Sequence, residues 1–185
     1  MKKILLVVIM GLLLGTVVFA DHAQDSLALG GVFGIGVGGN GSYLYPDFYP
    51  MNLSLHIPKV PIIWSVNIRF LQGFGFGITG DWYFAEPTLV SKTTSNDDGT
   101  YELKIDWYVG VGGYTNIYTG PFGGNVGLRI PFGVSWHAME QIRQLEVSVG
   151  SVAGVGIGGR KNTDPFVDWF FIPLELGVRW WFDGK

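Results

Sequence analysis

The sequence predicts an all-β fold, an eight-stranded antiparallel up-and-down β-barrel that follows a cleaved N-terminal signal peptide. Three observations lead to this prediction. An apolar leader opens the chain, eight later segments alternate apolar and polar residues with period two, and the charged residues of those segments all share the polar side. Strict alternation is typical of strands whose two faces meet different surroundings.

The first twenty residues predict the signal peptide (1–20). Two lysines precede the apolar run 4–17, and Ala20 ends a small-residue cleavage pattern. The run is shorter than the ~20 apolar residues of a membrane helix, and no charged stop-transfer cluster follows it. We therefore expect residues 21–185 to form a single β-barrel domain.

The composition of the chain argues against several classes of function. The chain has no cysteine, so it has no disulfide and no thiolate metal site, and we expect neither a metal nor another cofactor. Loss of the two leader lysines takes the formal charge from −3 to −5, which argues against nucleic acid as a partner. Charged residues make up 15% of the chain, below the roughly 25% of ordinary soluble domains, while 29 residues are glycine.

The first four predicted strands lie before residue 85. Segments 27–38 and 51–57 alternate more weakly than the two that follow, 60–70 and 73–84. In the third segment Trp64 and Val66 share an apolar face, and Asn67 lies on the other face.

The last four predicted strands are 101–113, 125–136, 144–159 and about 169–182. Pro131 and Pro173 interrupt two of them and predict bulges, because a closed barrel has no edge where a missing N–H is harmless. Between the fourth and fifth strands, a hairpin turning at Asp97, Asp98 and Gly99 would extend both strands.

Charged residues on the strands share the polar face, and their signs nearly cancel. We predict that they form an ion-pair network that fills the lumen, since an unpaired buried charge costs several kcal/mol on an order-of-magnitude scale. We expect Arg129 to lie nearest the centre. The predicted network comprises Arg69, Asp81, Lys104, Asp106, Arg129, Glu146, Glu175 and Arg179, and Glu102 shares their face.

Adjacent strands suggest partners within this network. Arg129 is expected to meet Asp106 and Glu146 on its two neighbouring strands. Arg69 is expected to link to Asp81, and Arg179 is expected to meet Glu146 or to reach across the lumen.

Alternation alone does not say which face is outside, because a soluble lipocalin-like barrel and an outer-membrane barrel have opposite polarity. The polar face here is mostly Gly and Ser with single charges, which suits a narrow lumen. Large aromatics also lie near strand ends, as in membrane girdles. We therefore expect a transmembrane β-barrel of the bacterial outer membrane. The expected periplasmic girdle is Trp82, Phe84, Trp136, Trp180 and Phe182, and the expected outer aromatics are Phe70, Phe74 and Phe170.

The last strand resembles the assembly signal of outer-membrane barrels. Glu175, Gly177, Trp180 and Phe182 occupy its polar, glycine and aromatic places, although three residues follow Phe182 where the bacterial pattern usually ends. The mature chain as a whole resembles the small eight-stranded OmpX/OmpW-like barrels. It is most similar to a spirochaete small-barrel family of unassigned function, through segments such as "FGFGITGDWYF" and "LRIPFGVSW". The resemblance implies location and fold far more strongly than activity.

Candidate chemistry is sparse, and we predict that the chain is not an enzyme and has no catalytic residue. The Gly34-x-Gly36-x-x-Gly39 pattern lacks the following helix that phosphate binding needs. His56 shares a face with Ser54, and His137 with Ser135, but the sequence places no third group to orient either histidine.

Aromatic residues crowd a predicted extracellular loop between residues 40 and 50. They suit either a contact site, because aromatics dominate binding hot spots, or packing on the barrel rim. These loop contact candidates are Tyr43, Tyr45, Phe48 and Tyr49.

The sequence thus predicts a structural or surface-interaction role with a filled polar lumen. The alternatives are a narrow, porin-like conduit for small hydrophobic molecules, as in OmpW-like barrels, and a lipid-modifying barrel enzyme. Expected partners are outer-membrane lipids, the barrel-assembly machinery, and an extracellular ligand or host protein that binds the loops.

Overall fold

A computed structural model of the chain describes residues 26–40, 43–69, 74–85, 88–96, 99–119, 122–137 and 144–182. The predicted signal peptide lies outside these residues. The described residues include no helix that is long and apolar enough to cross a membrane.

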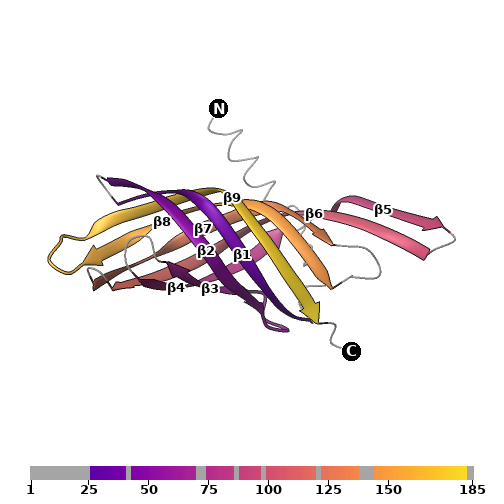
Figure 1. Ribbon diagram of the computed structural model, residues 1–185, viewed down its shortest axis with the longest axis horizontal. Helices are drawn as coiled ribbons and strands as arrows, with labels where there is room; N and C mark the ends of the chain where they lie inside the picture. Colours follow the sequence, from indigo (N-terminus) through magenta and orange to yellow (C-terminus); the bar gives the residue numbers. More distant parts are fainter. Residues whose placement is uncertain are drawn as a thin grey trace, which may run out of the picture.

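Eight of the nine described strands close into an antiparallel up-and-down barrel, which confirms the predicted fold (Figure 1). Apart from β5, each strand pairs with the barrel strands next to it in the chain, so that β4 pairs with β6, and β1 pairs with β9 to complete the wall. The strands are β1 (Leu27–Asn40), β2 (Tyr43–His56), β3 (Ile63–Arg69), β4 (Gly75–Ala85), β5 (Thr88–Asn96), β6 (Gly99–Thr119), β7 (Phe122–His137), β8 (Leu145–Arg160) and β9 (Phe166–Phe182).

The ninth strand, β5, belongs to a hairpin that projects from the barrel. β5 pairs with the first half of β6, and the second half of β6 pairs with β4 to close the wall. The expected hairpin at residues 97–99 therefore forms, with Asn96 opposite Gly99. Figure 1 shows this β5–β6 ribbon extending beyond the barrel wall. It leaves the barrel at the end where β1 begins and β9 finishes, which we call the termini end; the opposite end is the far end.

The two faces of the barrel are inverted relative to a soluble protein. Most inward side chains are polar or charged and buried, as Asn67, Asp81 and Arg129 illustrate. Outward side chains are apolar and exposed on every barrel strand, from β1 to β9. Examples in chain order are Leu29, Leu53, Trp64, Phe76, Val111, Leu128, Val155 and Val178.

The two prolines inside strands behave differently. At Pro173 the register of β9 shifts against both β1 and β8, as predicted for a bulge. Across Pro131 the pairing of β7 with β8 keeps one register, so the bulge predicted there is wrong. Pro131 is fully buried and faces the lumen.

The Pro173 bulge frees a backbone carbonyl on the apolar outer face. The hydroxyl of Ser151 on β8 donates a hydrogen bond to this Pro173 oxygen at 2.9 Å. We predict that Ser151→Ala lowers the free energy of unfolding by about 0.5–1.5 kcal/mol, because the hydrogen bond to the Pro173 carbonyl is lost. Urea denaturation of the folded barrel measures this loss. Thr115→Val, on the exposed face of β6, is the control and is expected to change stability by less than about 0.5 kcal/mol.

The expected extracellular loop at residues 43–50 is wrong, because these residues continue β2. Tyr45 lies opposite Gly38 and Phe48 opposite Ile35, so the hairpin with β1 is longer than predicted. Pro46 and Pro50 suggested a loop in the sequence. They fall in the half of β2 before Asn52, where the pairing with β3 begins, and proline is tolerated at such an edge.

Candidate functional site in the barrel lumen

A buried ion triad occupies the middle of the lumen. Arg129 on β7 places Nε 3.0 Å from Asp81 Oδ1 on β4, and its Nη2 lies 3.7 Å from Glu175 Oε2 on β9. All three side chains are nearly inaccessible to solvent. The pairing register explains the reach, since Gly112 on β6 lies directly between Asp81 and Arg129 and has no side chain to block it. The triad joins three strands that do not pair with one another.

The partners predicted for Arg129 are wrong. Arg129 lies opposite Gly112, whereas Asp106 lies opposite Ser135, six residues away along β7. At about 3.3 Å per residue this separation is roughly 20 Å, too far for an ion pair. Glu146 lies opposite His137, eight residues from Arg129, and is farther still. The alternation gave the face of each charge and not its height in the barrel.

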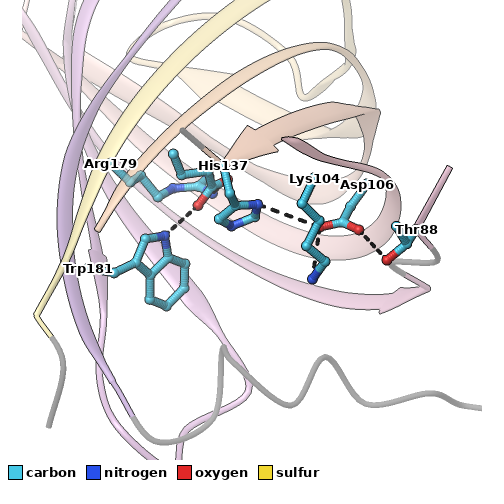
Figure 2. Close-up of polar contacts among 7 residues, drawn as sticks. Thr88, Lys104, Asp106, His137, Arg179 and Trp181 are labelled. Carbon is cyan, nitrogen blue, oxygen red and sulfur yellow. Dashed lines mark hydrogen bonds and ion pairs between the residues drawn. The ribbon is translucent and has the colours of Figure 1, made fainter. Parts of the chain in front are cut away.

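Arg179 meets Glu146, the partner expected for it, nearer the termini end. Its Nη1 donates to Glu146 Oε1 at 2.9 Å, and the two residues are direct neighbours across β8 and β9. The indole Nε1 of Trp181 donates to the other carboxylate oxygen at 2.7 Å (Figure 2). The Trp181 ring also lies 5.3 Å from the ring of His56, whose Nδ1 is 2.8 Å from the Ser26 carbonyl oxygen. These contacts tie both ends of the described chain to the lumen.

A third polar group surrounds Asp106 where the β5–β6 ribbon joins the barrel (Figure 2). The hydroxyl of Thr88 donates to Asp106 Oδ1 at 2.6 Å. Lys104 Nζ and His137 Nδ1 lie 3.3 Å and 3.5 Å from Asp106 Oδ2. Asp106 is buried, but Lys104 and His137 are part-exposed, so this group lies at the mouth of the lumen.

A fourth group, at the far end, was missed by sequence reasoning. Asp168 on β9 accepts hydrogen bonds from Asn125 Nδ2 and, at 3.2 Å, from the Tyr114 hydroxyl. Asn116 Nδ2 donates to Asn125 Oδ1 at 2.7 Å. The last strand was expected to start near residue 169, which left Asp168 outside it.

Phe170 was expected among the outer aromatics, and this is wrong. Its ring is buried in the lumen, 5.2 Å from the Tyr114 ring, and it packs with Val152 and Ile172. The cause is the Pro173 bulge, which moves every residue before it to the opposite face.

Glycines provide the space that these inward rings fill. A Cβ at Gly154 would overlap the Phe170 ring, and a Cβ at Gly156 would lie 2.6 Å from the Tyr114 hydroxyl. A Cβ at Gly133 would lie 2.7 Å from the Tyr108 hydroxyl. The many glycines on the polar face of the strands were therefore a usable signal for aromatic residues inside the lumen.

The girdle residues predicted for the periplasmic side point outward near the termini end. Trp82, Trp136, Trp180 and Phe182 are exposed, and Phe84 is half-exposed with its ring 6.0 Å from that of Trp82. The side chains of Arg69, Glu102 and the four loop contact candidates lie outside the described residues, as does Phe70.

No cluster of three or more His, Asp or Glu side chains that could hold a metal ion occurs in the described part of the chain. Comparison with known proteins gives no match: neither a family model, nor a curated protein, nor a solved structure matches this chain.

Proposed function

We propose that the chain is an integral β-barrel of the bacterial outer membrane, with a structural or surface-interaction role and a filled polar lumen. One observation carries the proposal: apolar side chains cover the outside of all eight barrel strands, and buried charges occupy the inside. In water such an outer surface would be a large exposed apolar patch, whereas in lipid it is the surface that a barrel requires.

Further features support this proposal. The outward aromatics at the termini end suit the membrane interface, and the strand ending in Trp180 and Phe182 suits recognition by the barrel-assembly machinery. The expected cleaved signal peptide would deliver the chain across the inner membrane. We propose membership in the OmpX/OmpW-like group on the same features, with membrane lipids as the surrounding partner and an extracellular ligand or host protein at the far end.

Because the chain has no cysteine, single-cysteine variants report topology cleanly. We predict that a maleimide too large to cross the outer membrane labels Lys161→Cys in intact cells, since Lys161 is exposed in the turn between β8 and β9 at the far end. Thr93→Cys, exposed on β5, is expected to be labelled only after the outer membrane is permeabilised.

The unmodified chain, which should not react, controls for background. Equal labelling of both variants in intact cells would contradict the proposed orientation. Recovery of the protein in the soluble periplasmic fraction would contradict the location itself.

The conduit alternative differs in what the lumen passes. Side chains from opposite walls meet across the middle of the barrel at Arg129, which favours a filled lumen. Planar bilayer recordings separate the two functions. The purified barrel is expected to give no discrete conductance steps, and stable steps would favour the conduit.

The enzyme alternative has one specific observation in its favour. Asp106 supplies the orienting carboxylate that the sequence did not place, 3.5 Å from His137 Nδ1, and Ser135 lies directly opposite Asp106. However, Ser135 is buried and faces the lumen, away from the surface that lipid would cover. We therefore propose that the chain is not an enzyme. Phospholipid turnover abolished by His137→Ala would overturn this.

A further inference from the structure

Asparagines form a single row across the wall of the barrel, inside the lumen. Asn52 on β2 lies opposite Asn67 on β3, which lies opposite Gly77 on β4. Gly77 lies opposite Asn116 on β6. A Cβ at Gly77 would overlap the side chains of Asn67 and Asn116, so the two amides converge over the glycine. The row brings several strong hydrogen-bonding groups to one height in a buried place.

Several oxygens of this row have no hydrogen-bond partner among the described residues. They are the Oδ1 atoms of Asn52, Asn67 and Asn116, together with the hydroxyl of Thr79 on β4. All four side chains are at least nine-tenths buried. A buried polar group that lacks a partner costs about 1–3 kcal/mol, so four such groups at one place favour a bound group that hydrogen-bonds to them.

A cavity of about 10 Å³ lies among these same residues, with Arg129 and the rings of Tyr114 and Phe170 completing its lining. This volume is close to that needed by one water molecule, and the partners of a buried water are usually three polar groups. We propose that the asparagine row and Thr79 form a binding site for one structural water, which links Thr79 on β4 to two of the three asparagines on β2, β3 and β6 inside the lumen.

The chemistry of the site favours water over a cation. A water molecule donates two hydrogen bonds to amide oxygens and accepts one from the Thr79 hydroxyl. Four neutral oxygens would also suit a monovalent cation, but the Arg129 guanidinium lines the same cavity and repels a positive ion. The inference rests on the lumen alone and does not depend on the proposed location in the outer membrane.

Crystals of the refolded barrel, grown in sodium salt and in rubidium salt, test the proposal directly. We expect one ordered solvent peak within hydrogen-bond distance of at least two of the four oxygens, with no anomalous signal in rubidium. An empty cavity or a rubidium peak would overturn the water assignment.

A double-mutant cycle gives an independent measurement in solution. Asn52 and Thr79 stand on strands separated by β3, about 10 Å apart, and share only the cavity. Asn52→Leu and Thr79→Val are each expected to lower the folding equilibrium constant about tenfold, and the double variant to lose about fivefold less than the product.

The control pair is Thr79→Val with Ser148→Ala, because Ser148 faces the lumen from β8 and does not line the cavity. In this control pair, the double variant is expected to lower the folding equilibrium constant by the product of the two single losses. Multiplicative losses in both pairs would contradict a shared water.

Discussion

Replacing Arg129 with methionine is expected to lower the free energy of unfolding by about 3–5 kcal/mol, one of the largest effects of any single substitution inside this barrel. Arg129 holds Asp81 at 3.0 Å and Glu175 at 3.7 Å, and all three are buried. Methionine fills a similar volume but removes the cation that contacts both buried carboxylates. Urea denaturation, followed by the difference in gel migration between folded and heated protein, measures the loss.

A triple variant separates charge from packing. Asp81→Asn, Arg129→Met and Glu175→Gln together remove every charge of the triad while keeping side chains of similar size. Because no carboxylate is then left uncompensated, the triple variant is expected to regain most of the stability that the single variant loses. If Arg129→Met alone costs less than about 1 kcal/mol, the triad does not stabilise the lumen.

The fold followed from the sequence because alternation reports faces directly. Period-two patterning placed Asp81 and Arg129 inside and Leu128 outside, and the number of such segments predicted the barrel. The same patterning placed Arg179 beside Glu146, since Glu146 is near the start of β8, Arg179 is near the end of β9, and a hairpin at the other end joins these two strands. Local pattern and neighbouring strands sufficed for these features.

The sequence predictions fail where the face on which a side chain lies, or its height in the barrel, depends on distant parts of the chain. The Pro173 bulge reversed the faces of the residues before it, so Phe170 was expected outside and Asp168 was not found. Arg129 was assigned to neighbours on adjacent strands, although its partner Asp81 lies two strands away, beyond Gly112. The strand register fixes these heights, and it depends on turn lengths and bulges that alternation does not report.

The largest effect on the outer face is expected at Leu128, the residue next to Arg129. Leu128 is 65% exposed on the middle of β7, where its side chain points away from the lumen. Leu128→Arg is expected to lower the free energy of unfolding by about 2–4 kcal/mol if this face meets hydrocarbon, because a charge at mid-membrane depth loses its hydration. If the face met water, the same exposed substitution would change stability by at most about 0.5 kcal/mol. Urea denaturation of the barrel in lipid vesicles measures the difference.

Two controls make Leu128→Arg decisive. Leu128→Met keeps the site apolar and is expected to be nearly neutral, while Thr93→Arg adds the same charge on the β5–β6 ribbon, outside the barrel wall. Adjacent positions are thus expected to have opposite requirements: an arginine stabilises the barrel at 129 and destabilises it at 128. That reversal over one residue is the period-two signature of a wall with a polar inside and a lipid outside. Equal tolerance of Leu128→Arg and Thr93→Arg would mean that water covers the outer face, and the outer-membrane proposal would then fail.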